Sequence, residues 1–145
     1  MRIYTIGFTG KTAQEFFEKL DLSDARYLLD VRIRNNSQLA GFTKKGNIEY
    51  FTEQLTPLTY LELPELAPTA EMFKQYREDK DWPAYETGYL NLLGERDLRN
   101  SLDGDMFAAG SVLLCTEPTP EMCHRRLAAE FLAARIFKSG SIVHL

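Results

Sequence analysis

Cysteine, histidine and excess basic charge are scarce in this chain of 145 residues. Two cysteines are too few for a disulfide framework, so we expect a protein of the reducing cytoplasm. The formal net charge is −4, which disfavours sequence-independent binding to nucleic acid, because such binding needs a basic surface. Nucleic acid is therefore possible as a partner but not favoured, and a single phosphate group could still bind at a local cluster.

Long hydrophobic runs are also missing. No run approaches the ~18–20 residues that cross a bilayer, so we expect no membrane association. The first residues, 1–6, indicate a strand rather than a signal peptide. Hydrophobic residues make up 44% and charged residues 26% of the chain, which is typical of one folded domain, here residues 1–145. Nothing in the pattern indicates an oligomeric state.

Strand-like and helix-like segments alternate along the chain. Strands are predicted over 2–6, 26–31, 59–63, 111–115 and 141–145, and helices over 13–20, 48–55, 70–78, 84–100 and 119–138. The alternation predicts an α/β fold, with a mostly parallel sheet of about five strands, helices on both faces and Rossmann- or flavodoxin-like layering. In such sheets ligands bind beyond the carboxyl ends of the strands.

Gly10-Lys11-Thr12 follows the first strand and invites comparison with a phosphate-binding loop. That loop needs a glycine five positions before Gly10, where this chain has Thr5. Thr12 and Glu15 instead have the spacing of a helix capping box. We therefore predict a helix start here and no nucleotide-binding loop.

The densest group of reactive side chains lies between Cys115 and Arg125. Cys115 is the predicted nucleophile, because a helix start near Thr119 and the cation of Arg125 would lower the pKa of its thiol from the usual ~8.5. His124 is the candidate base, and Glu117 is a candidate acid, base or orienting group for the imidazole.

The end of the second predicted strand contributes Asp30 and Arg32 to the same edge of the sheet. Arg32 and Arg125 are predicted to bind an anionic group of the substrate through their guanidinium forks. Asp30 is a second candidate acid or base. No cofactor is predicted.

Metal binding and a purely structural role are the main alternatives. Cys115, Glu117, Cys123 and His124 are residue types that bind zinc. However, Cys123 and His124 would be adjacent on the predicted helix and point about 100° apart, so we predict no metal. Free cysteines are often only buried hydrophobic residues, which leaves a structural role open, above all for Cys123. The spacing from Cys115 to Arg125 is also too long for the tight loop of a cysteine-dependent phosphatase.

Six short segments form a recognisable set: Thr5-Ile6-Gly7, Asp30-Val31-Arg32 with Ser37, Leu63-Pro64-Glu65-Leu66, Cys115-Thr116-Glu117, Cys123-His124-Arg125 and Val143-His144-Leu145. Together they resemble the signature of the DUF488 family, whose function is unknown, over nearly the whole chain. Asn35 stands where the family pattern has proline, and Ala67 where glycine is usual. The resemblance implies that Gly7, Ser37 and Cys123 belong to the shared site, Gly7 through close approach of the backbone.

Two functional classes fit these observations, with a structural role as a third. The first is an enzyme, of the cysteine-dependent transferase or hydrolase type, acting on a small anionic substrate that is nucleotide-like or phosphorylated. The second is a non-catalytic sensor or binding module that uses the same pocket for a nucleotide or a nucleic-acid end. In the third, the thiols and Arg125 tie the last helix to the sheet through buried hydrogen bonds.

Overall fold

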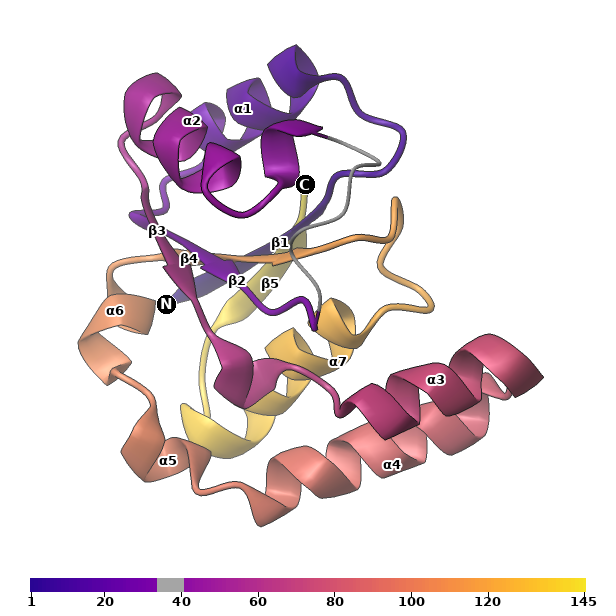
Figure 1. Ribbon diagram of the computed structural model, residues 1–145. Coiled ribbons are helices and arrows are strands. Elements are labelled where there is room, and N and C mark those ends of the chain that lie inside the picture. The colour runs from indigo at the N-terminus through magenta and orange to yellow at the C-terminus, as the bar shows by residue number, and fades with distance from the viewer. Residues whose placement is uncertain (34–40) are drawn as a thin grey trace.

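Five parallel strands form the centre of the protein in the computed structural model, which describes residues 1–33 and 41–145 (Figure 1). The strands are β1 (Arg2–Gly7), β2 (Tyr27–Asp30), β3 (Thr59–Glu62), β4 (Ser111–Cys115) and β5 (Ser141–His144). Their order across the sheet, which the sequence left open, is β3-β2-β4-β1-β5. The predicted parallel α/β architecture is confirmed.

The helices occupy the intervals between the strands. They are α1 (Ala13–Leu22), α2 (Asn47–Leu55), α3 (Ala70–Asp79), α4 (Trp82–Glu95), α5 (Leu98–Ser101), α6 (Gly104–Ala108) and α7 (His124–Phe131). Short 3-10 turns cover Gly41–Thr43 and Pro64–Leu66, and a π-helical turn, Leu132–Ile136, continues α7. No helix in the described ranges has the length and apolar character needed to cross a bilayer.

Helices cover both faces of the sheet, as predicted. On one face α1 and α2 pack against Tyr4, Ile6 and Leu114. On the other face α4 to α7 pack against Ile3 and Leu113. Figure 1 shows these two layers above and below the sheet, with the α3–α4 hairpin extending beyond it. Because alternate residues of a strand point to opposite faces, the central strands β1, β2 and β4 each contribute to both cores.

The first helix begins as the sequence predicts. The side chain of Thr12 accepts a hydrogen bond from the backbone N–H of Glu15 at 3.1 Å, which caps α1. The glycine-lysine-threonine segment therefore belongs to a helix start.

The last long helix begins later than predicted, at His124 rather than near Thr119. Cys123 is its N-cap and has an extended backbone, with φ −138° and ψ 137°. Carbonyl groups of residues 117, 120 and 121 accept hydrogen bonds from the arginine side chains at 125 and 126 instead of from helical N–H groups. These side-chain contacts hold residues 116–122 as a loop. The predicted helix over 84–100 is likewise divided, into α4 and α5.

The strand order creates a crevice at the carboxyl edge of the sheet. β2 and β4 are neighbours, and β2 leads to α2 on one face while β4 leads to α7 on the other. Ligands of open α/β sheets bind at such divergence points.

The core face beneath α7 supports a first test. Leu29 on β2 is 0% exposed, so Leu29→Ala should lower the free energy of unfolding by about 2–5 kcal/mol through lost burial and a residual cavity. Leu22, at the end of α1, is 84% exposed and is the matched control, since its replacement by alanine should change stability by less than about 0.5 kcal/mol. Denaturant unfolding of both variants measures the difference, and equal effects would contradict this burial pattern.

Candidate functional site

A pocket of about 460 Å³ lies at the crevice between β2 and β4. Its lining combines three groups of side chains: thiols and imidazole from Cys115, Cys123 and His124; charged groups from Arg32, Arg77 and Glu117; and aromatic rings from Phe73, Tyr76, Trp82 and Tyr85, with Ile33, Thr116 and Met122. This volume is within the usual range of small-molecule sites. The residues come from the ends of β2 and β4, the start of α7 and the α3–α4 hairpin.

Cys115 and His124 form a close pair within this lining. Nδ1 of His124 lies 3.5 Å from Sγ of Cys115, and Nε2 lies 2.8 Å from the carbonyl oxygen of Val31. A carbonyl can only accept a hydrogen bond, so Nε2 carries the proton that is donated to Val31. In the neutral ring Nδ1 is then the unprotonated nitrogen. Sγ of Cys115 lies 3.5 Å from Nδ1 and 3.7 Å from Nε2, so the sulfur is close to both ring nitrogens. The backbone of Val31, not the Glu117 carboxylate as expected, orients the imidazole.

The environment of Cys115 favours its thiolate. The Cys123 thiol is the largest influence that lowers the pKa of Cys115; burial opposes it, while the backbone N–H groups of residues 116 and 117 and the charge of Arg125 also lower it. The pKa of Cys123 moves upward, chiefly because of burial and secondly because of its contact with Cys115. Cys115 is therefore the more acidic of the two buried thiols.

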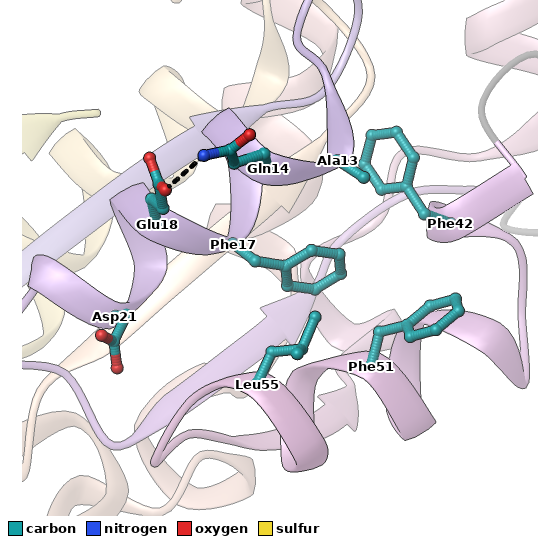
Figure 2. A pocket seen from close by; sticks show the side chains of 8 residues that line it. All are labelled: Ala13, Gln14, Phe17, Glu18, Asp21, Phe42, Phe51 and Leu55. Carbon is teal, nitrogen blue, oxygen red and sulfur yellow. Dashed lines mark hydrogen bonds between the residues drawn. The ribbon is translucent and has the colours of Figure 1, made fainter.

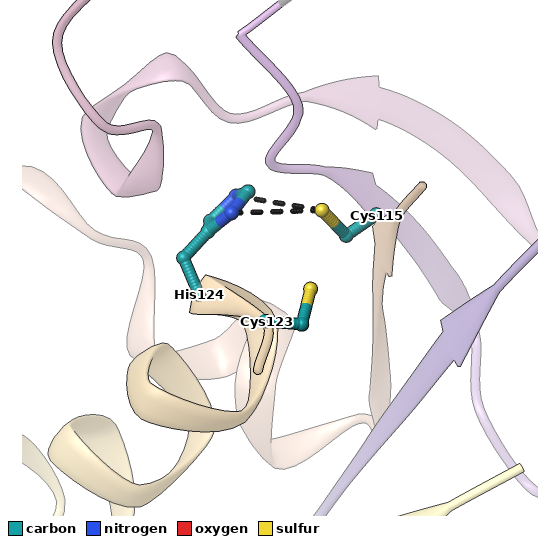
Figure 3. A group of neighbouring side chains, drawn as sticks. All are labelled: Cys115, Cys123 and His124. Atoms are coloured by element: carbon teal, nitrogen blue, oxygen red, sulfur yellow. Dashed lines mark hydrogen bonds between the residues drawn. The ribbon is translucent and has the colours of Figure 1, made fainter. Parts of the chain in front are cut away.

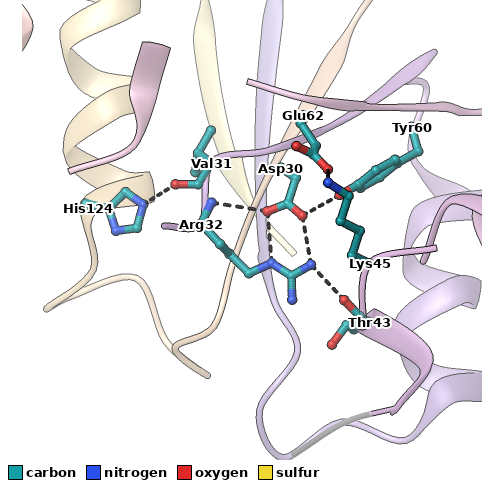
Figure 4. Close-up of polar contacts among 8 residues, drawn as sticks. All are labelled: Asp30, Val31, Arg32, Thr43, Lys45, Tyr60, Glu62 and His124. Carbon is teal, nitrogen blue, oxygen red and sulfur yellow. Dashed lines mark hydrogen bonds and ion pairs between the residues drawn. The ribbon is translucent and has the colours of Figure 1, made fainter. Parts of the chain in front are cut away.

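Asp30 does not lie beside the thiols. In the strand register Asp30 pairs with Leu114, one residue before Cys115, so its side chain points to the opposite face of the sheet. There it accepts hydrogen bonds from Nε and Nη2 of Arg32 and from the hydroxyl of Tyr60 (Figure 4). The backbone N–H of Arg32 also donates to Oδ1 at 3.1 Å, so four donors surround the carboxylate, and Asp30 positions Arg32.

Arg32 connects the two sides of the sheet edge. Its Nη2 also donates to the carbonyl of Thr43, and its guanidinium lies over the ring of Phe8. Burial opposes the charge of Arg32, but hydrogen bonding to Asp30 prevails and raises its pKa. Nη1 has no hydrogen-bond partner within the described residues, and the side chain lines the pocket. Arg32 therefore lines the pocket as a buried cation whose side chain is only 2% exposed.

Arg125 does not line the pocket, although it was predicted to bind substrate. It is 1% exposed, and it donates from Nη1 to the carbonyl of Glu117 at 2.7 Å and from Nε to the hydroxyl of Thr5 at 3.4 Å. A Cβ atom on Gly7 would overlap the same carbonyl oxygen, which confirms the predicted close backbone approach. Thr5 also bonds Nδ1 of His144 at 2.6 Å. Arg125 thus joins α7, β1 and the loop after β4.

The remaining predicted residues have simple positions. The Glu117 carboxylate is exposed at the pocket and makes no hydrogen bond or ion pair with other described residues, while its backbone contacts Arg125. Ser37 lies outside the described residues. The sequence did not single out Arg77, Trp82 or Tyr76, and the two aromatic residues have the spacing typical of a buried helical stripe.

A second, apolar pocket of about 330 Å³ lies between α1 and α2, on the far face of the sheet (Figure 2). Phe17, Phe42, Phe51 and Leu55 form most of its surface. It contains none of the predicted site residues.

Cys123 lies before the first residue of α7, which brings its thiol close to two other residues that can bind a metal ion. Because Cys123 precedes α7, its side chain is not tied to the helical 100° step from His124. The ligand atoms of Cys115, Cys123 and His124 lie within 4.8 Å of one another.

The burial of Arg125 generates a stability prediction. Arg125→Ala leaves the Glu117 carbonyl without its donor and should lower the free energy of unfolding by about 1–3 kcal/mol. Arg26→Ala is the control, because Arg26 is exposed and its side chain contacts no other described residue through a hydrogen bond or ion pair. Thermal and denaturant unfolding compare the two, and an Arg125→Ala protein as stable as the control would overturn this structural role.

The thiol pair generates a pH prediction. Cys123 stabilises the Cys115 thiolate by donating to it, so Cys123→Ala should raise the pKa of Cys115, and alkylation of Cys115 should then require higher pH. Cys123→Ser retains a hydroxyl donor and should reverse much of the shift. The measurement is the rate of iodoacetamide alkylation against pH with a chelator present, and identical midpoints for wild type and Cys123→Ala would contradict the coupling.

Comparison with known proteins gives one match. Neither the curated proteins nor the solved structures contain a significant match to the chain. Residues 12–132 match the family described as "Domain of unknown function DUF488", which covers most of the chain and includes the cysteines, His124 and Arg125. The protein therefore belongs to the DUF488 family, as its sequence motifs had indicated.

Proposed function

We propose that the protein is an enzyme in which Cys115 acts as a nucleophile on a small anionic substrate bound in the pocket between β2 and β4. The observation that carries the proposal is the close contact between Sγ of Cys115 and the imidazole of His124, whose Nε2 is held by Val31, at a pocket surface. A nucleophile, a base and a group that orients the base are the parts that covalent catalysis requires. The orienting group here is a backbone carbonyl of β2.

The chemistry proceeds in two steps. Nδ1 of His124 accepts the thiol proton while Sγ of Cys115 attacks an electrophilic centre of the substrate, and the leaving group departs with its bonding electrons and takes the proton from the imidazolium. An acceptor then attacks the covalent intermediate and releases the thiolate. Water as acceptor makes the enzyme a hydrolase, and a second substrate makes it a transferase. The exposed Glu117 carboxylate at the pocket supports a role in activating the acceptor.

The lining supports an anionic substrate with a planar group, as in a nucleotide. The exposed guanidinium of Arg77 provides donors for a phosphate or carboxylate, and Arg32, which also lines the pocket, adds a buried positive charge. Rings from the α3–α4 hairpin form the adjoining wall, with Trp82 and Tyr85 stacked at 5.4 Å and Tyr76 against both. Aromatic walls bind planar rings by stacking.

Two small electrophiles test the nucleophile and the anion donors together. Iodoacetate and iodoacetamide both form a carbon–sulfur bond with loss of iodide, but only iodoacetate is an anion. The ratio of their alkylation rates at Cys115 should exceed that for free N-acetylcysteine by about tenfold, the value of one hydrogen bond to a charged group. Mass mapping locates the modified thiol, with chelator present throughout and Cys115→Ser as the blank.

Variants of the two arginines show which of them causes the preference for iodoacetate over iodoacetamide. Arg32→Gln and Arg77→Gln should each lower the ratio, and the exposed Arg77 is the safer variant because Arg32→Gln leaves Asp30 without its partner. Arg26→Ala should leave it unchanged. Alkylation only after unfolding would exclude Cys115 as a nucleophile. If AMP raises the melting temperature while Cys115 stays unreactive, the pocket belongs to a binding module instead.

A further inference from the structure

Three buried side chains at the pocket surface have the chemistry of a metal site. Cys115 ends β4, Cys123 caps α7 and His124 is the first residue of α7. Figure 3 shows the two sulfur atoms and the imidazole pointing toward one another, and their ligand atoms lie within 4.8 Å of each other. The thiol mechanism proposed above uses Cys115 and His124 directly but gives Cys123 only an indirect role.

The measured spacing fits a tetrahedral centre. Zinc bound to sulfur at ~2.3 Å and to nitrogen at ~2.0–2.1 Å, with a tetrahedral angle between them, separates the two ligand atoms by about 3.5 Å. Sγ of Cys115 and Nδ1 of His124 are 3.5 Å apart. Sγ of Cys123 lies within 4.8 Å of the other two ligand atoms, so a small side-chain rotation brings it to the distance of a third zinc ligand.

The surroundings of His124 are those of a metal-binding histidine. A metal-bound imidazole usually donates its other N–H to a carbonyl or carboxylate, which fixes the ring and its tautomer. Nε2 of His124 makes this bond to Val31 at 2.8 Å, and Sγ of Cys115 lies 3.5 Å from Nδ1 and 3.7 Å from Nε2. The ring is therefore oriented before any ion binds.

Charge balance also favours a divalent ion. Two thiolates and a neutral imidazole give a set with charge −2, which a divalent ion neutralises, so the buried complex avoids the cost of an unpaired charge. Sulfur ligands select zinc-like ions over Mg²⁺ and Ca²⁺, which prefer oxygen. All three ligand residues line the pocket, so a fourth coordination position faces it.

We propose that Cys115, Cys123 and His124 bind one Zn²⁺ ion, with the fourth coordination position open to the pocket for water or an anionic ligand. Binding releases the two thiol protons to solvent. The bound ion holds Cys115 as a ligand, so the metal-bound and free-thiol forms exclude one another. Metal binding itself does not depend on the proposed thiol reaction.

Cobalt is the probe that tests the site. Protein reduced and treated with chelator, then freed of it, should bind one Co²⁺ per chain, with the visible absorption of a tetrahedral ion and sulfur-to-cobalt charge-transfer bands. Zn²⁺ added afterwards should remove both signals. Zn²⁺ should also protect Cys115 from iodoacetamide, with reactivity restored by chelator.

Cys123→Ala and His124→Gln identify the ligands. Each should weaken Co²⁺ binding by more than about tenfold and abolish the tetrahedral spectrum. His144→Gln replaces the other histidine of the chain and should bind as wild type. Circular dichroism confirms that each variant is folded. Absence of a tetrahedral spectrum in wild type, or the same spectrum in folded Cys123→Ala, would overturn the proposal.

The outcomes separate this inference from the proposed function. Iodoacetate-selective alkylation of Cys115 in chelator, without a cobalt spectrum, leaves the thiol reaction standing and removes the metal site. A tetrahedral cobalt spectrum, together with a Cys115 that stays unreactive in chelator, leaves the metal site standing and removes the thiol reaction.

Discussion

The hydrogen bond from the buried guanidinium of Arg125 to the carbonyl of Glu117 is the contact on which the rest of the site depends. Within the described residues Arg125 has no carboxylate partner, so its charge is satisfied by oxygens of the backbone and of Thr5. That requirement holds the loop after β4 against Gly7, where only a glycine leaves room for the carbonyl. The loop in turn ends at Cys123 and sets the first residue of α7.

The parallel register divides the family motifs into three groups with different tasks. Thr5, Gly7, Arg125 and His144 form the support beneath the loop. Asp30, Arg32 and Tyr60 form a hydrogen-bonded group on the other face of the sheet, and Arg32 extends from it to the pocket. The thiols and His124 form the reactive group. Residues close together in sequence, such as His124 and Arg125, thus belong to different groups, because adjacent helical positions point in different directions.

The same reactive group supports thiol chemistry and metal binding for one physical reason. Val31 fixes the tautomer of His124, which leaves the free lone pair on Nδ1, the ring nitrogen 3.5 Å from Sγ of Cys115. That lone pair accepts a proton in the proposed thiol reaction and a metal ion in the proposed zinc site. Cys123 distinguishes the two, since it is a ligand in one and a hydrogen-bond donor to the thiolate in the other.

The sequence by itself determined the α/β class, the helices on both faces, the capped start of α1 and the edge of the sheet where Cys115 and Arg32 lie, because periodicity and capping are local properties of the chain. Only the tertiary structure decided the strand order, the burial of Arg125 away from the pocket, the placement of Asp30 on the other face and the start of α7 at His124. The strand order, the burial of Arg125 and the placement of Asp30 depend on contacts between distant segments. The start of α7 depends on arginine side chains at 125 and 126, which donate to the carbonyls of residues 117, 120 and 121 in place of helical N–H groups. The aromatic wall of the α3–α4 hairpin could not be predicted from the sequence either. Rings that face a core and rings that face a ligand have the same helical spacing.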